Sequence, residues 1–300
     1  MTNPRKSIAL VEFKDLVFKK LLVLSGLIAI AILLGIFLTL LLKSSLSIQK
    51  TGLSFFYQSV WDPVRETFGA LPFFLGTMIT SVLALLISLP FSFALAIFLG
   101  EYLKSGIWRN ILNGTLDLLA GIPSIIYGFW GLFVLVPIVR RFELAIGVVP
   151  HGVGILSASL VLALMIIPYA ASISREVIAL VPQDLKEAAL SLGATPFEVV
   201  LRIVLPYAKS GIFAGVLMAF GRAISETMAV TMLIGNANKI PASIFSPANT
   251  LASVLANEFA EASEALYLST LIELALLLFF VTAFFSFIGR LIIKKWVVIR

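Results

Sequence analysis

The sequence predicts an all-α integral membrane protein with six transmembrane helices. Of its 300 residues, 60% are hydrophobic and 13% are charged, so the chain has more apolar surface than a soluble domain of this length could bury. The apolar residues form long runs without the alternation of barrel strands. Because the bilayer offers no water to backbone groups, helices are the expected spanning form.

Six runs exceed the roughly 20 residues that a helix needs to cross a hydrocarbon core of about 30 Å. They cover residues 21–42, 67–100, 118–139, 144–174, 210–238 and 265–289. The first four contain no Asp, Glu, Lys or Arg, the fifth contains Arg222 and Glu226, and the sixth contains Glu273. The first run follows a basic segment, as a signal peptide does, but its length and lack of a small-residue cleavage site predict a retained helix.

The distribution of basic residues predicts the orientation of these helices. Fifteen Lys and Arg residues fall on the side of the N-terminus and six on the opposite side, with Arg222 inside a span. Cytoplasmic loops are enriched in Lys and Arg, so both termini are expected in the cytoplasm. The loop between the fourth and fifth spans is then cytoplasmic too.

Composition also excludes several kinds of site. The chain has no Cys and a single His, which excludes disulfides, thiolate metal sites and clusters of several His ligands. The net charge of +6 arises from basic residues at the edges of apolar runs, where membrane topology explains them better than nucleic acid does. No metal, cofactor or nucleic-acid partner is expected.

The cytoplasmic loop at 187–206 has the pattern of a helix, a glycine and a second helix. The apolar positions of the first helix recur at i, i+3, i+4 and i+7, on one face: Leu185, Ala188, Ala189 and Leu192. Gly193 suits a left-handed helix end. Thr195, Pro196 and Glu198 fit the N-cap, first residue and capping-box partner of the second helix, and Pro206 fits the start of the next membrane helix. Periodicity alone also allows an amphipathic pair lying on the lipid surface.

The spacing within this loop resembles the EAA loop of binding-protein-dependent ABC importer permeases, position for position. The matching residues are Glu187, Ala188, Ala189, Gly193, Ile203, Leu205 and Pro206. The resemblance implies a type I ABC importer permease fold, in which Glu187, Ala188, Ala189 and Gly193 belong to a coupling helix that docks on a cytoplasmic ATPase. The chain contains no GxxxxGK[ST] phosphate loop, so it is expected to be a transport subunit rather than an enzyme, with ATP hydrolysed by a partner.

The fifth span carries the segment GRAISETMAVTMLIGN at 221–236. Arg222 follows Pro206 by about 16 residues, or about 24 Å of helix, which places it near the middle of the membrane. A charge there costs about 2.5 to 3.5 kcal/mol, so it is expected to face the protein interior or a polar path. Glu226 lies four residues on, and the two form either a structural ion pair between helices or an anion site in the translocation path.

This segment resembles the PstC-type subunit of phosphate importers, as do GIPSIIYGFWGLFVLVP at 121–137 and REVIALVPQDLKEAALSLGAT at 175–195. The resemblance covers residues 71–300, and it divides the chain into an N-terminal part at 1–66, with the first helix and an outer loop, and a permease core at 67–300. It implies that Arg222 and Glu226 are the charged pair linked to phosphate passage.

The same resemblance implies an assembly in a bacterial or archaeal cytoplasmic membrane. The implied partners are a second permease of the PstA type, an ATPase dimer of the PstB type, an extracytoplasmic phosphate-binding protein of the PstS type, inorganic phosphate and the lipid bilayer. The nearest alternative is a permease for another oxyanion such as sulfate or molybdate. An intramembrane hydrolase is disfavoured because no Lys lies within a span and the only His is expected in a loop, so neither could activate a serine at depth, and a scaffold would not need a buried Arg and Glu.

The remaining candidates have structural interpretations. Small residues at Gly211, Gly215 and Ala219 are expected to let the fifth helix pack closely on a neighbour. Glu273 is expected to bond to a neighbouring helix or face the cavity, and His151 to lie in an outer loop. The loop at 239–264 is expected to form a short helix from Asn249 or Thr250, which either meets the binding protein or serves as a connector.

Overall fold

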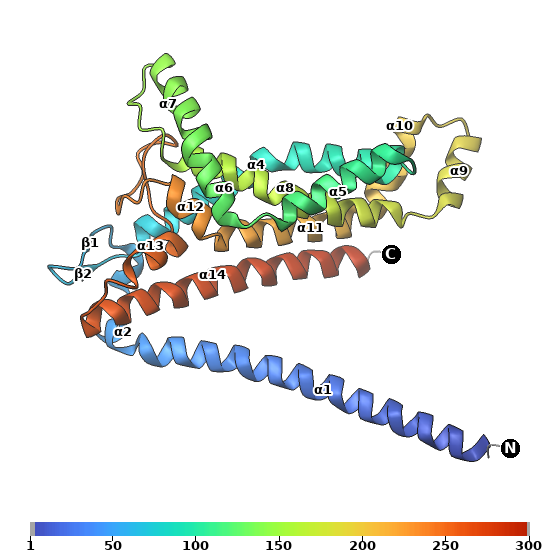
Figure 1. The fold of residues 1–300 in the computed structure, drawn as a ribbon, viewed down its shortest axis with the longest axis horizontal. Coiled ribbons are helices and arrows are strands. Elements are labelled where there is room, and N and C mark those ends of the chain that lie inside the picture. The colour runs from blue at the N-terminus through green and yellow to red at the C-terminus, as the bar shows by residue number, and fades with distance from the viewer. Residues whose placement is uncertain (1–3, 299–300) are drawn as a thin grey trace.

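The computed structural model describes residues 4–298, and the side chains of residues 15–295, as an elongated helical molecule (Figure 1). Three of its helical elements are π-helical turns, labelled η. The elements before the middle of the chain are α1 Pro4–Lys43, α2 Ser45–Thr51, α3 Ser54–Tyr57, β1 Trp61–Asp62, β2 Thr67–Phe68, α4 Leu71–Ile97, η1 Phe98–Tyr102 and α5 Ile107–Gly121. The later elements are α6 Ser124–Trp130, η2 Gly131–Leu135, α7 Val136–Ala145, α8 Ile155–Ala179, α9 Gln183–Ser191, α10 Pro196–Val199, η3 Val200–Val204, α11 Leu205–Ser225, α12 Met228–Leu233, α13 Leu251–Glu258 and α14 Ala265–Val298.

Six helices within the described residues are long and apolar enough to cross a membrane, which agrees with the predicted number. They are Asp15–Lys43, Leu71–Tyr102, Ser124–Ala145, Ile155–Ala179, Pro196–Ser225 and Ala265–Lys295. In Figure 1 the start of α1 and the end of α14 lie toward the same end of the molecule as α9, while α13 lies toward the opposite end. We call these the α9 end and the α13 end.

The boundaries of the third and fourth spans differ from the predicted ones. The predicted third span at 118–139 crosses a break between α5 and α6, where Ile122 and Pro123 are extended. Proline disfavours helical geometry at the residue before it, so the GIP segment ends α5. The predicted fourth span begins too early, because 146–154 form a loop whose Gly147 and Gly152 have positive φ.

The predicted bounds of the fifth span, 210–238, are wrong at both ends. Its helix begins at Pro196, since η3 joins α10 to α11 without an interruption, and Pro206 therefore lies inside a continuous helix instead of starting one. The π-helical turn directly before Pro206 accommodates a residue that lacks an N–H. At the other end the helix stops at Ser225, and Glu226 already has an extended backbone.

The bundle centre is built by α4, α8 and α11, which pack along their lengths. The predicted small-residue contact is confirmed: a Cβ on Gly211 would lie 2.5 Å from the Val177 side chain, and one on Gly215 would lie 3.1 Å from Ile173 Cβ. Ala219 is fully buried. These residues let α11 approach α8 closely and thereby fix the direction in which the end of α11 points.

The α13 end is closed by a compact polar and aromatic cluster. The predicted helix in the 239–264 loop is α13, with Thr250 as its N-cap. Glu258, at its last residue, accepts hydrogen bonds from Trp61 Nε1 and Tyr267 Oη, both at 2.7 Å, and from Asn238 Nδ2 at 2.9 Å. One carboxylate therefore ties the hairpin of β1 and β2, the loop after α12, and α14 to α13.

The first helix stands apart from the bundle. Figure 1 shows α1 diverging from α14 toward the α9 end, with the two helices joined near α2. Within the described residues, Phe37 contacts the rings of Phe279 and Phe280, and Ser47 of α2 hydrogen-bonds to Ser269 and Thr270. As its uniform apolarity suggests, this helix is peripheral to the bundle.

Two further acidic residues are buried, one in α14 and one in α7. Glu273 of α14 is 4% exposed and borders an apolar cavity of about 400 Å³ between α2 and α14. Glu143 of α7 is 1% exposed and accepts a 2.7 Å hydrogen bond from Gly152 N, which anchors the loop containing the exposed His151. His151 is thus the loop residue that was predicted.

Candidate functional site

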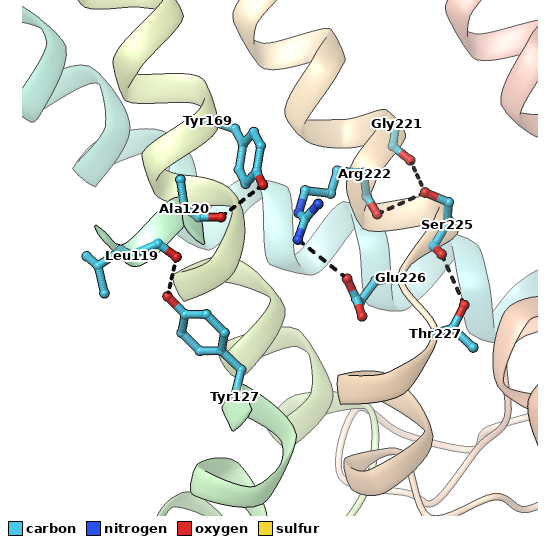
Figure 2. Close-up of polar contacts among 9 residues, drawn as sticks. All are labelled: Leu119, Ala120, Tyr127, Tyr169, Gly221, Arg222, Ser225, Glu226 and Thr227. Atoms are coloured by element: carbon cyan, nitrogen blue, oxygen red, sulfur yellow. Dashed lines mark hydrogen bonds and ion pairs between the residues drawn. The ribbon is translucent and has the colours of Figure 1, made fainter. Parts of the chain in front are cut away.

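The intramembrane charge sits at the end of α11. Arg222 belongs to the last turn of this helix, and its side chain is 33% exposed. Glu226 is the residue after the helix, with φ −68° and ψ 128°, and its side chain is 7% exposed. The two residues are paired four positions apart, as predicted, because the backbone leaves the helix only after the Glu226 side chain, and Figure 2 shows the carboxylate directed toward Arg222.

The pair is loose. Arg222 Nη2 lies 4.0 Å from Glu226 Oε2, which is too long for a hydrogen bond. Arg222 Nε is buried and has no hydrogen-bond partner among the described residues. The guanidinium is thus drawn electrostatically to a carboxylate that does not saturate its donors, so donors remain for another acceptor.

An aromatic ring supports the guanidinium on one face. Arg222 Cζ lies 4.5 Å from the ring centroid of Tyr169, which belongs to α8. Figure 2 shows Tyr169 and Glu226 flanking Arg222, with the two residues coming from different elements. A cation over an aromatic face is attracted by the ring quadrupole. Tyr169 therefore restrains the Arg222 guanidinium, which the Glu226 carboxylate attracts only weakly.

Two tyrosine hydroxyls cap the nearby end of α5. Tyr169 Oη donates to the Ala120 carbonyl at 3.2 Å, and Tyr127 Oη donates to the Leu119 carbonyl at 2.9 Å. The last four carbonyls of a helix lack helical partners, and the break after Gly121 leaves these two in need of donors. The break between α5 and α6 is therefore connected to the Arg222 site through Tyr169.

The break after α11 is closed by local hydrogen bonds. Ser225 Oγ reaches the carbonyls of Gly221 at 3.0 Å and Arg222 at 3.3 Å, and Thr227 Oγ1 donates to the Ser225 carbonyl at 3.3 Å. Of these carbonyls, that of Ser225 is the last in the helix, so Thr227 supplies a donor to a group without a helical partner. The hydroxyl bonds lie at the point where the backbone leaves the helix at Glu226.

The second candidate region is the α9–α10 elbow, which comprises α9, the Gly193 turn and α10 at one end of the bundle (Figure 1). Gly193 has φ +87°, the left-handed conformation that was predicted. Its N–H bonds to the Leu190 carbonyl at 2.9 Å, and the Ala194 N–H bonds to the Ala189 carbonyl at 3.1 Å. These two bonds form a Schellman motif.

The start of the second short helix is also as predicted. Thr195 Oγ1 accepts from the Glu198 N–H at 3.3 Å, while the Glu198 carboxylate accepts from the Thr195 N–H at 2.9 Å. Pro196 occupies the first helical turn. The capping box and the Schellman motif together set a sharp angle between α9 and the long helix whose last turn carries Arg222.

The predicted docking residues lie on the outside of this elbow. Glu187, Ala188 and Gly193 are exposed, and Ala189 is half-buried. Leu192 is 89% exposed, a large value for a leucine beside a membrane surface. The face that periodicity assigned to Leu185, Ala188, Ala189 and Leu192 is therefore open, as a docking surface requires, while the residues of the Arg222 site lie well inside the bundle.

A buried ion pair beneath the elbow was missed. Lys186 of α9 contacts Glu101 of η1 through Nζ and Oε2, and their side chains are 5% and 12% exposed. Lys104 Nζ lies 3.5 Å from the other carboxylate oxygen. No local pattern indicates this contact, because Glu101 lies 85 residues before Lys186 in the sequence.

Tyr169 was also missed, although the sequence carries a signal for it. A tyrosine inside a span free of Asp, Glu, Lys and Arg, next to Pro168, has a hydroxyl that requires a partner at membrane depth. The identity of that partner depends on how α5 and α8 pack, which sequence periodicity does not define.

Comparisons with known proteins agree with this architecture. The family model of the binding-protein-dependent transport system inner membrane component matches residues 92–297. The phosphate transport system permease protein PstC of Haemophilus influenzae is 44% identical, covering 93% of this chain and 92% of that protein, and the PstC of Pasteurella multocida is 42% identical, covering 94% and 92%.

A solved structure of the MetNI methionine ABC transporter in an inward-facing conformation has the same fold. Its TM-score is 0.55 at 18% sequence identity, over 74% of this chain and 91% of that one. The type I ABC importer permease fold predicted from the EAA spacing is thereby confirmed. The chain belongs to the family of binding-protein-dependent transport system inner membrane components and, within that family, to the PstC permeases.

Proposed function

We propose that this chain is a permease subunit of an ATP-driven phosphate importer and that Arg222 and Glu226 lie on the path of the anion. The observation that carries this proposal is the loose Arg222–Glu226 pair: a guanidinium with unused donors inside the bundle of a chain whose relatives are named phosphate permeases. A purely structural ion pair at this depth is expected to close to hydrogen-bonding distance.

The chemistry of phosphate suits this arrangement. Near neutral pH phosphate is an anion that keeps at least one proton, so it can accept hydrogen bonds from a guanidinium and donate one to a carboxylate. Arg222 supplies the positive charge and a forked donor. Glu226 accepts from the phosphate proton and repels the fully deprotonated sulfate ion, so the pair favours phosphate over sulfate and molybdate.

The α9–α10 elbow is the proposed connection to the motor. Glu187, Ala188, Ala189 and Gly193 form a largely exposed surface of mostly small residues that fits a groove of an ATPase subunit of the PstB type. The long helix Pro196–Ser225 carries movement of this elbow to Arg222 because no non-helical residue interrupts it. A second permease of the PstA type completes the path, and a binding protein of the PstS type delivers phosphate.

This function also sets the orientation in the membrane. The elbow must face the ATPase, so the α9 end is cytoplasmic and both termini are cytoplasmic, as the excess of basic residues on that side suggests. The α13 end then faces the binding protein. Residues 67–300 form the permease core, and residues 1–66 supply the first helix and an outer segment.

Uptake of radiolabelled phosphate into vesicles that contain the full set of partner subunits tests the proposal. We expect ATP-dependent accumulation that unlabelled phosphate competes with and that equal concentrations of sulfate or molybdate leave largely unchanged. A matched complex carrying Arg222→Gln is the negative control. Strong competition by sulfate or molybdate would instead identify a permease for another oxyanion.

A further inference from the structure

We propose that Tyr169 is a positioning residue for transport: its ring holds the Arg222 guanidinium so that the arginine presents its donors to the anion and does not collapse onto Glu226. This inference rests on the proposed function of Arg222. It adds a residue on α8 and, through that residue, a link to the end of α5.

The first observation that supports the proposal concerns the contacts that restrain the Arg222 guanidinium. Arg222 Nε has no hydrogen-bond partner among the described residues, and the Glu226 carboxylate is 4.0 Å from Nη2. The ring of Tyr169, with its centroid 4.5 Å from Arg222 Cζ, lies within the range of a cation–π contact, whereas the carboxylate lies beyond hydrogen-bonding distance. Because two-thirds of the Arg222 side chain is shielded from solvent, the attraction between cation and ring is stronger than at an exposed site.

The second support is that the ring is itself held in place. Tyr169 follows Pro168 in α8, and its hydroxyl donates to the Ala120 carbonyl at 3.2 Å. That carbonyl belongs to the last turn of α5 and has no helical partner of its own. The ring therefore has anchors at both ends, the α8 backbone and the α5 terminus, as Figure 2 shows.

The geometry explains what the ring does for an anion. A ring on one face of a planar guanidinium leaves the edge with its N–H donors free, and this edge is the part that forms paired hydrogen bonds to an oxyanion. Without the ring, Arg222 gains by moving the short remaining distance to Glu226, and the pair then neutralises itself. Loss of the ring is expected to weaken phosphate binding in the path more than it slows turnover.

Tyr127 provides a matched control within the same view. Its hydroxyl makes the equivalent bond to the adjacent Leu119 carbonyl at 2.9 Å, and Figure 2 shows its ring lying apart from the guanidinium. Tyr127→Phe and Tyr169→Phe each remove one hydroxyl from the same helix end. The two variants thus separate general loosening of that helix end from an effect on Arg222.

The test uses the reconstituted complex with phenylalanine and increasingly fluorinated phenylalanines at position 169. Fluorine withdraws electron density from the ring face with little change in shape, so the KM for phosphate uptake should rise stepwise, by about fivefold from phenylalanine to the most fluorinated ring. The maximal rate and subunit assembly should stay close to those of Tyr169→Phe, and Tyr127→Phe should keep the wild-type KM.

A KM that stays constant across the fluorinated series, in a wild-type complex that does import phosphate, would overturn the inference and leave the proposed function intact. An equal rise of KM in Tyr127→Phe and Tyr169→Phe, with no dependence on fluorine, would also overturn it, because the effect would then come from the end of α5. Failure of the wild-type complex to import phosphate would refute the proposed function, and the inference with it.

Discussion

The Arg222–Glu226 pair and the Lys186–Glu101 pair both join a basic and an acidic side chain in largely buried surroundings, yet they differ in how completely they are satisfied. Lys186 and Glu101 are in direct contact, are 5% and 12% exposed, and have Lys104 as an additional neighbour. Arg222 is 33% exposed, stands 4.0 Å from its carboxylate and keeps an unpartnered Nε among the described residues. One pair is closed and the other is open.

This difference indicates different uses. A closed pair between α9 and η1 holds the α9–α10 elbow next to η1, because neither charge can leave without leaving the other unpaired in buried surroundings. An open pair keeps guanidinium donors available for another acceptor. It is also less stabilising than a closed pair would be in the same position. Sequence alone would rank Arg222 and Glu226 as the stronger pair, since they are four residues apart and the others are 85 residues apart.

The largest expected effect concerns the open pair. Arg222→Gln should reduce phosphate uptake by at least about 100-fold, since an anion in the path loses its compensating charge. The double variant Arg222→Gln with Glu226→Gln should assemble normally and stay inactive. Uptake, ATPase activity and copurification of the subunits are the measurements. Recovery of uptake in the double variant would show that Arg222 and Glu226 are a structural pair, like Lys186 and Glu101.

The closed pair should behave in the opposite way. Lys186→Met leaves Glu101 buried with only Lys104 nearby, and should destabilise the purified complex by about 2 kcal/mol. Adding Glu101→Leu removes the unpaired charge and should restore most of the stability and uptake. Thermal unfolding of the three complexes in detergent is the measurement. A double variant no more stable than Lys186→Met would contradict the structural role.

The variant Gly193→Val should separate an effect on transport from an effect on stability at the α9–α10 elbow. A β-branched residue at φ +87° is strained, although nothing lies within 4 Å of the added Cβ, so the cost is conformational and about 1 to 2 kcal/mol. Membrane insertion and expression should persist while ATP-driven uptake falls several-fold. Gly193→Asn, which tolerates the left-handed conformation, is the control and should retain more uptake than the valine variant.

The smallest expected effect is on selectivity. Glu226→Gln keeps the size of the side chain and removes its charge, so sulfate should compete with phosphate uptake a few-fold better than in the wild-type complex. The comparison of inhibition by sulfate in the two complexes, at equal expression, measures this effect. Unchanged discrimination together with an unchanged rate would remove Glu226 from the proposed path.

The part of this molecule that the sequence predicts best is the part governed by local rules. The number of spans follows from hydrophobic length, and the Gly193 turn and the Thr195 capping box follow from backbone requirements within a few residues. The ends of the spans were less predictable, because apolar residues also fill the break at Ile122 and Pro123. A hydrophobic run does not show where its helix stops.

The contacts that complete the site depend on packing between distant segments. Tyr169 reaches Ala120 because α8 packs against α5, and Lys186 reaches Glu101 because its long side chain spans from α9 to η1. Neither contact has a periodicity that a single sequence reveals. Arg222 could be singled out because charge is rare in a span, whereas Tyr169 is a residue type that is common in membrane proteins and does not stand out.

The continuous helix from Pro196 to Ser225 constrains the length of the chain as well as its composition. Each residue in a helix turns its successor by about 100° and advances it by about 1.5 Å, so one residue inserted between the elbow and Arg222 would rotate the guanidinium away from Tyr169. Four inserted residues would nearly restore the direction but move it about 6 Å along the axis. Substitutions on the lipid-facing side of this segment should therefore be tolerated, while insertions and deletions there should not.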